Sequence, residues 1–425
     1  MNTKMKTSKQ AYVNWLLLSL FFSYQYLLRG YPGIFTSEIR RTFLLNAEQY
    51  SDFGAYCMLA YSFLQIPFGI ALDRVGIRRL VLMAFALCVI GQYLFSHAQT
   101  FEGALWGRTL LGIGATPGYM SALKMVADSF CEKSCGLFIG LTGAMGNLAV
   151  AAFEPRLKAV GLAHQDWRFP AFYLEVAGLL LWIACVLWLR PSPSGSKKTL
   201  PPDTKDSSDF WKNLLHVAFQ YKVYLYAAFV IGTNILAATL ADLWGKSFLN
   251  AKYNLGEQEA VNYVQWIQIG MLTGSVALPM IFHSGAKVLW GIRVSCAFLA
   301  AIFGIFIYGP STLPGWMIQA LLLLVGFFGG ADILACTLGA KMSNPKTSGM
   351  IISWINSVGM LGEPILEKWI GKALARNWSG LLDEHGLHVY VASDYESAIG
   401  VMFLVVCICF VLSCCLRRKA IAPRE

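Results

Sequence analysis

The chain has 425 residues, of which 56% are hydrophobic and only 14% are charged, and its formal net charge is +10. Soluble domains carry about 25% charged residues, so this composition excludes an ordinary soluble globular protein. Most of the Lys and Arg fall in turns and tails between long apolar runs, on the side expected to face the cytoplasm. This distribution excludes a phosphate-binding stripe, and we expect no nucleic-acid partner.

Six apolar runs in the first part of the chain are long enough to cross a bilayer, which takes about 20 residues each. They cover residues 12–35, 53–72, 80–96, 101–123, 136–155 and 169–189. Lys4, Lys6 and Lys9 precede the first run, and Arg417, Arg418 and Lys419 follow the last. The positive-inside rule therefore predicts cytoplasmic termini and a multi-pass protein of the inner (plasma) membrane.

A change of composition divides the chain near its middle. Residues 190–209 are rich in Pro, Ser, Lys and Asp, which indicates a flexible cytoplasmic linker. We expect an amino-terminal bundle over 1–189, a linker over 190–221 and a carboxyl-terminal bundle over 222–425. Six further runs follow, at residues 222–244, 260–282, 288–309, 316–338, 349–371 and 398–415.

The two parts resemble each other in residues as well as in the number of runs. Glu48-Gln49 corresponds to Glu257-Gln258, and Glu154-Pro155 corresponds to Glu363-Pro364. Both pairs are offset by the same 209 positions. The sequence therefore predicts an all-α membrane protein of twelve transmembrane helices in two pseudo-symmetric six-helix bundles.

The turn between the second and third runs carries one acid and three arginines. It reads Gly69-Ile-Ala-Leu-Asp73-Arg74-Val-Gly76-Ile-Arg78-Arg79. This stretch resembles the signature loop of the major facilitator superfamily, with every fixed position filled. The resemblance implies that the loop gates access from the cytoplasm, and the residues that fill the motif are Gly69, Asp73, Arg74, Gly76 and Arg78.

Arg29 is the first candidate for binding a solute, because a charge at the centre of a bilayer costs at least ~2.5 kcal/mol and must face a cavity or a partner. Gln25 and Tyr26 lie four and three residues before it, on the same helix face. The guanidinium fork suits a carboxylate or a phosphate. The stretch resembles the first-span Arg of anion-transporting members of the family, and the alternative is an Arg that snorkels to lipid headgroups.

A second buried arginine is expected in the fourth run. Arg108, Gly112 and Gly114 resemble the fourth-span motif of the same family. The resemblance implies a role for Arg108 in proton coupling or in a buried charge network, and a structural ion pair is the alternative.

Four acidic residues within the runs are candidates for proton coupling, since a buried carboxylate can bind and release a proton. Glu154 and Glu363 fall late in their runs and directly precede Pro, Asp242 shares a face with Asn234, and Asp332 has no partner nearby in sequence. The alternative for Asp242 is an exposed pair with Lys246 at the end of a span. Polar residues expected to line the same cavity are Asn147, Asn234, Gln265, Gln268 and Asn356.

Several motifs are missing. The chain has no Gly-x-x-x-x-Gly-Lys-Ser/Thr loop for ATP and no His/Cys/Glu cluster at metal-ligand spacing. We therefore expect no cofactor, no metal and no enzymatic activity.

The resemblance implies a secondary transporter that works by alternating access. The predicted function is proton symport of a small anionic or zwitterionic metabolite, such as an organic acid, an amino acid or a carboxylate siderophore, by a monomer. Two alternatives remain open: proton-coupled efflux of amphipathic compounds, and a sensor with the same fold that moves no solute.

Overall fold

A computed structural model describes residues 9–191, 217–283, 285–341, 348–384 and 386–416. Nearly all of these residues are helical, and within them the only β-type pairing is an isolated bridge between Leu382 and His388. Residues 192–216 of the expected linker and the tail arginines 417 and 418 lie outside the described part of the chain. The all-α prediction is confirmed.

The helices run in chain order as follows: α1 (Lys9–Ile34), α2 (Thr36–Phe43), α3 (Ala47–Val75), α4 (Ile77–His97), α5 (Phe101–Ala115), α6 (Pro117–Ser129), α7 (Glu132–His164), α8 (Arg168–Trp188), α10 (Tyr221–Val230), α11 (Leu236–Thr239), α12 (Gly245–Tyr253), α13 (Glu257–Ile281), α14 (Gly285–Tyr308), α15 (Gly315–Gly329), α16 (Asp332–Lys341), α17 (Ser348–Met360), α18 (Gly362–Arg376) and α19 (Ala392–Cys415). Two π-helical turns, η1 (Ile231–Ile235) and η2 (Leu240–Trp244), interrupt the stretch between α10 and α12.

Nine helical segments among the described residues are long and apolar enough to cross a membrane. Three further segments of membrane length are consistent with the twelve expected from the sequence. One is α1, which contains Arg29, and the others are the broken pairs α5–α6 and α17–α18. Thr116 and Leu361 are the single residues at the two breaks.

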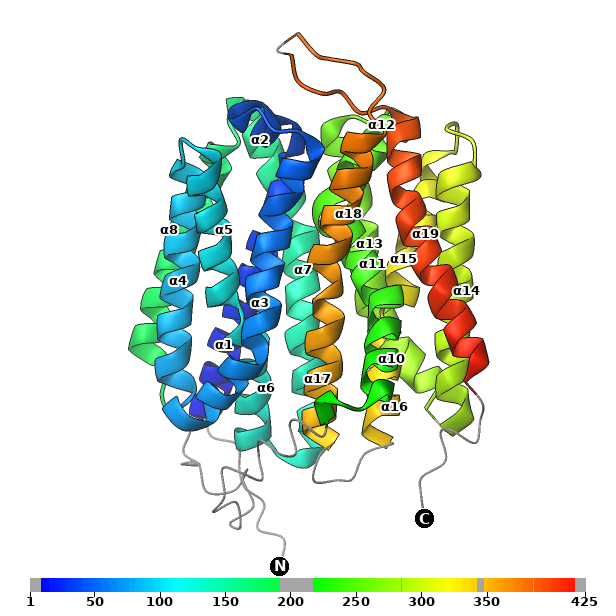
Figure 1. Cartoon of the computed structure of the whole chain (residues 1–425). Coiled ribbons are helices and arrows are strands. Elements are labelled where there is room, and N and C mark those ends of the chain that lie inside the picture. Colours follow the sequence, from blue (N-terminus) through cyan, green and yellow to red (C-terminus); the bar gives the residue numbers. More distant parts are fainter. Residues whose placement is uncertain (1–8, 192–216, 284, 342–347, 385, 417–425) are drawn as a thin grey trace, which may run out of the picture.

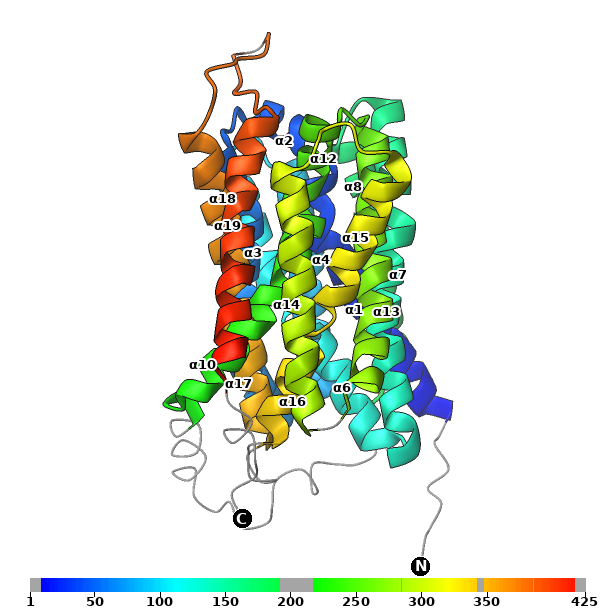
Figure 2. The same ribbon diagram turned by 90° about the vertical axis from the view of Figure 1, so that its right-hand side faces the viewer.

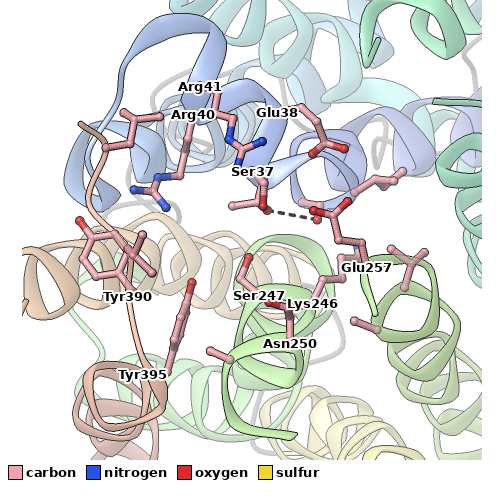
Figure 3. Close-up of a pocket in the computed structure, with 18 of the residues that line it drawn as sticks. Ser37, Glu38, Arg40, Arg41, Lys246, Ser247, Asn250, Glu257, Tyr390 and Tyr395 are labelled. Carbon is pink, nitrogen blue, oxygen red and sulfur yellow. Dashed lines mark hydrogen bonds between the residues drawn. The ribbon is translucent and has the colours of Figure 1, made fainter. Parts of the chain in front are cut away.

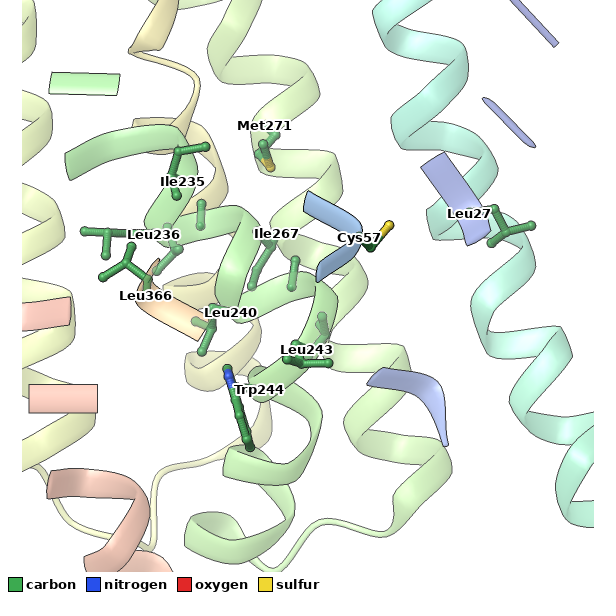
Figure 4. Close-up of a cluster of buried hydrophobic side chains, with 14 of the residues drawn as sticks. Leu27, Cys57, Ile235, Leu236, Leu240, Leu243, Trp244, Ile267, Met271 and Leu366 are labelled. Carbon is green, nitrogen blue, oxygen red and sulfur yellow. The ribbon is translucent and has the colours of Figure 1, made fainter. Parts of the chain in front are cut away.

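The segments stand side by side, roughly parallel, in both views (Figure 1, Figure 2). Short α2 and α12 lie at one end of the bundle, which we call the α2 end, whereas α1 begins and α19 finishes at the opposite end (Figure 1). Helices before residue 190 meet those after residue 217 chiefly through α3 against α18, α7 against α13, and α1 against η2. The π-helical stretch lies in the middle of the apolar core, where Leu236, Leu240 and Trp244 are almost fully buried (Figure 4).

Candidate functional site

Arg29 lies where α1 meets η2 and α18. Its Nε donates to Oδ2 of Asp242 at 2.6 Å, and its Nη1 lies 4.0 Å from Oε2 of Glu363. Its guanidinium stacks 4.6 Å from the centre of the Tyr26 ring. Only 11% of the Arg29 side chain is exposed. Arg29 therefore points between the two parts of the chain, which contradicts the alternative of an arginine snorkelling to lipid.

The backbone beside Arg29 is held by Arg108, because Pro32 removes one helical hydrogen bond. Pro32 has no N–H, so it leaves the carbonyl of Leu28 without its donor four residues on. Arg108 of α5 donates Nη1 to that carbonyl at 2.8 Å and Nη2 to the carbonyl of Arg29 at 2.9 Å. Its Nε donates to the carbonyl of Phe53 on α3. Arg108 thus clamps α1 to α3 through three carbonyl oxygens and is fully buried.

Asp242 reaches Arg29 because two features bring its turn close to α1. It lies within the π-helical turn η2, and such turns are frequent at functional sites. Gly33 of α1 packs directly on the backbone of this turn, and a Cβ there would collide with the carbonyl of Asp242. The close approach therefore requires glycine at position 33.

Glu154 forms the second ion pair of the region. Its Oε2 lies 2.9 Å from Nζ of Lys246 on α12 and accepts a hydrogen bond from Nε2 of Gln265 on α13, also at 2.9 Å. Glu154, Lys246 and Asp242 are at most 6% exposed. The alternative of an exposed Asp242–Lys246 pair is therefore wrong, because Lys246 turns toward Glu154 on the neighbouring bundle.

The structure corrects the expected depth of the two Glu-Pro sites. Helix α7 continues beyond Pro155 to His164, and α18 begins at Gly362, so Glu363 lies at the break in the middle of its span. Pro364 is accommodated because the first turn of a helix needs no N–H from that residue. Both acids thus lie inside the bundle rather than near its end.

One residue of the region was not singled out from the sequence. Glu367 lies one turn after Glu363 on α18, is 1% exposed, and contacts the backbone of Gly54 on α3. The spacing of four residues from Glu363 was the available signal, since it places both side chains on one helix face. The residues Arg29, Glu154, Asp242, Lys246, Glu363 and Glu367 are called the central charge cluster below.

Other expected site residues lie around the central charge cluster or apart from it. Gln25 is buried beside Gly118 of α6. Asn356 donates to Oε1 of Gln65 at 3.4 Å, which bridges α17 and α3, and Asn234 is half-buried in η1. Asp332 begins α16 and has no ion-pair partner among the described residues. The structure thus brings Arg29, Tyr26, Glu154, Asp242 and Glu363 together but leaves Asp332 outside.

The signature turn joins α3 to α4 at Gly76, whose φ of +88° favours glycine. Arg78 donates to the carbonyls of Val186 and Leu189, at 2.9 and 2.6 Å, so it binds the end of α8 within the same part of the chain. Arg293 binds the end of α19 in the same manner, through the carbonyls of Ser413 and Leu416. The side chain of Asp73 lies outside the described part of the structure, and the gating role of the turn stays a prediction.

A cavity of about 220 Å³ opens at the α2 end. Its walls carry Arg40 and Arg41 from α2, the rings of Tyr390 and Tyr395, and Ser247 and Asn250 from α12 (Figure 3). Two further residues of its lining are Lys246, a member of the central charge cluster, and Gly33, which packs on the backbone of Asp242. The cavity therefore reaches the edge of the central charge cluster at Lys246.

Lys158 bridges helices at the side of this cavity. Its Nζ lies 2.7 Å from Oε1 of Glu38 on α2 and 2.7 Å from Oε2 of Glu257 on α13. Burial raises the pKa of the Glu38 carboxyl, although the Lys158 ammonium opposes that shift. The arrangement links α2, α7 and α13 at the α2 end.

We expect the contribution of Glu38 to stability to fall with rising pH. A carboxyl whose pKa is raised in the folded state stabilises below its ordinary value, here 4.5, and loses that contribution as pH rises through the raised value. The melting temperature of the wild type minus that of Glu38→Gln should therefore be largest below pH 4.5 and shrink above it. Glu102→Gln, at an exposed acid, should show no such trend, and a flat difference for Glu38→Gln would contradict the assignment.

Comparisons with known proteins were made on sequence and on structure. A family model described as Major Facilitator Superfamily matches residues 16–365. The chain is 28% identical over 176 residues to a "Probable L-galactonate transporter" of Escherichia coli (strain K12), which covers 41% of this chain and 39% of that protein. It is 23% identical to the "MFS-type efflux pump elcC" of Phaeosphaeria nodorum, over 75% of this chain and 53% of the pump. It is 22% identical to the "Hexuronate transporter" of Bacillus subtilis (strain 168), over 65% of this chain and 68% of that transporter.

The fold resembles that of a crystallised bacterial homologue of the human lysosomal transporter Spinster, in an inward-facing and unoccupied conformation. The TM-score is 0.75 at 17% identity, over 96% of this chain and 98% of that one. The chain spans less than two thirds of the length of the galactonate transporter and of the efflux pump. These proteins are transporters rather than enzymes, which agrees with the expectation from the sequence.

Proposed function

The chain belongs to the major facilitator superfamily, and from this premise we propose that it is a secondary transporter which moves a small organic anion together with protons. The bundles proposed to move against each other are residues 1–189 and 222–425. Transport would proceed by alternating access, with the α2 end facing the outside of the plasma membrane and both termini in the cytoplasm.

The observation that carries the proposal is the position of Arg29. Among the described residues, a hydrogen-bond acceptor reaches only its Nε, and its two Nη groups are left without one, with Nη1 4.0 Å from Oε2 of Glu363. A carboxylate is the ligand that this fork of donors suits best. Tyr26 beneath the guanidinium provides an apolar face for the carbon skeleton of the solute.

A hexonate or hexuronate is the solute class we favour. Two relatives carry such acids in their names, the L-galactonate transporter and the hexuronate transporter. The cavity at the α2 end adds Ser247, Asn250 and two tyrosines, whose hydroxyl and amide groups suit a polyhydroxylated chain. Arg40 and Arg41 at the rim would attract an anion from solution.

Proton coupling is proposed to involve the carboxylates of the central charge cluster. Glu154, Asp242 and Glu363 are inside the bundle, at the contact between the two parts that must separate during transport. Asp332 lies apart from them and would contribute on its own, from the start of α16. Arg108 would act by holding α1 in place rather than by carrying a proton.

Efflux of an amphipathic cation is the second candidate, and the efflux pump among the relatives favours it. The central charge cluster contains more carboxylates than cations, and its unpaired carboxylates would then bind the transported cation directly.

A transport assay with the purified protein in liposomes distinguishes anion uptake from cation efflux. With an inward proton gradient, labelled L-galactonate or glucuronate should accumulate above its outside concentration, whereas galactose, which lacks the carboxylate, should not. Equal uptake of acid and neutral sugar would contradict anion transport, and extrusion of a lipophilic cation would favour efflux.

A further inference from the structure

Helices α3 and α18 approach each other closely through glycine on both sides. A Cβ added to Gly371 would meet Ser51 and the carbonyl of Ala47, and one added to Gly54 would overlap the carboxyl group of Glu367. Small residues of this kind let helices pack at short distance within a membrane. This contact, called the α3–α18 seam, joins the two parts of the chain and must open when the α2 end opens.

Glu367 lies inside the α3–α18 seam without the partners that an ionised carboxylate requires. Its Oε2 is buried and has no hydrogen-bond donor among the described residues, and no cation of those residues lies within 4.0 Å of it. Both oxygens of Glu363, one turn away, are also without a donor. An isolated buried charge is so costly that such a group binds a proton instead.

The charges around the seam leave one carboxylate uncompensated. The acids near the seam are Glu154, Asp242, Glu363 and Glu367, and the cations beside them are Arg29, Lys246 and Arg108. Arg29 pairs with Asp242, Lys246 pairs with Glu154, and Arg108 gives its hydrogen bonds to carbonyls. One proton bound to the Glu363–Glu367 pair restores neutrality.

Glu367 is the more suitable of the two to carry that proton. Glu363 has the guanidinium of Arg29 at 4.0 Å, whereas Glu367 lies against the uncharged backbone of Gly54. The groups that act electrostatically on Glu367 are Glu363 on its own helix, Asp242 on η2, Arg29 on α1, Arg108 on α5 and the Cys57 thiol on α3. The negative charges of Glu363 and Asp242 favour the neutral form of Glu367, and the two arginines oppose it.

We propose that Glu367 is a proton-carrying residue of the transport cycle: it takes a proton from water when the α3–α18 seam is open and holds that proton when the seam closes. This inference rests on the proposed transport function and assigns one of its protons. The proton enters from water on the α2 side and binds a carboxyl oxygen of Glu367. It then passes to the carboxylate of Glu363, one turn away on α18, and leaves that group to water when the opposite end of the bundle opens.

The first test needs no solute. Melting temperatures of the wild type, Glu367→Gln and the exposed control Glu102→Gln are measured between pH 5 and pH 9. The closed wild type binds one proton more than the unfolded chain at neutral pH, so its melting temperature should fall relative to that of Glu367→Gln as pH rises. A difference that does not change with pH overturns the proposal. If Glu367→Gln does not fold, Glu367→Met, which is also neutral, takes its place.

The second test separates proton coupling from solute binding in proteoliposomes with labelled L-galactonate and glucuronate. Glu367→Gln should exchange solute across the membrane at a rate within about twofold of the wild type but lose accumulation driven by a proton gradient. Accumulation at the wild-type level, or loss of exchange by a folded variant, overturns the proposal. If the wild type moves neither acid, the proposed function fails for these solutes, and the melting experiment still decides the role of Glu367.

Discussion

Replacing Arg29 with alanine is expected to lower the affinity for the transported acid by about 10- to 100-fold. Hydrogen bonds to charged groups contribute about 1.5–3 kcal/mol each, and every 1.4 kcal/mol is a factor of ten. Uptake of labelled acid at a concentration near the wild-type half-saturation point should therefore fall by about 5- to 50-fold. Arg29→Lys keeps the charge but loses the fork of donors, so it should recover only part of the uptake.

Two controls separate this effect from misfolding. Arg190→Ala removes an exposed arginine after the end of α8 that does not line the cavity, and its uptake should stay within about twofold of the wild type. Arg29→Ala/Asp242→Asn removes both members of the buried pair, so it should fold without an uncompensated carboxylate and still not bind the acid. Undiminished uptake by folded Arg29→Ala would rule out Arg29 as the binding residue.

Replacing Lys246 with methionine is expected to destabilise the folded protein by about 3–5 kcal/mol. The Glu154 carboxylate would lose its cation, and removing one partner of a buried ion pair leaves an unpaired charge of about that cost. The measurement is the unfolding free energy of the purified protein from SDS titration in mixed micelles.

The double variant identifies the cause. Lys246→Met/Glu154→Gln has no charge left to bury and should regain most of the lost stability, because a neutral Gln can still bond to Gln265. Lys372→Met, which removes a 59% exposed lysine 4.0 Å from Glu48, should change stability by less than about 1 kcal/mol. A double variant as unstable as Lys246→Met would show that packing, not charge, holds this site.

Much of the fold could be predicted because each membrane span is a separate apolar run. The sequence also placed four charged residues within spans, where a charged side chain must either pair with a partner or face a cavity. They are Arg29, Glu154, Asp242 and Glu363. The repeated Glu-Pro pattern, offset by 209 positions, pointed to two acids that both lie within the central charge cluster.

The pairing of these charges could not be predicted in the same way. Arg29 and Asp242 are 213 positions apart, and the π-helical turns between α10 and α12 shift the face on which Asp242 lies. A regular helix would place Lys246 beside Asp242, which is why the Glu154–Lys246 pair was missed. Glu367 falls within the run expected at 349–371 but was not singled out, although its spacing of four residues from Glu363 places both acids on one helix face.

The depth of the two Glu-Pro sites was misjudged for a related reason. Apolar runs mark where lipid contact ends, whereas α7 and α18 extend further as helices. The run expected at 136–155 ends at Pro155, but in the structure α7 continues through this proline to His164.

The central claim is that an acid and a proton cross together through the contact between the two bundles. Its most direct measurement records the internal pH of proteoliposomes, with no gradient imposed, when L-galactonate or glucuronate is added outside. We predict acidification of the interior that follows solute entry and is absent with galactose, with Arg29→Ala and with empty liposomes. Entry of the labelled acid with no change in internal pH would contradict the claim.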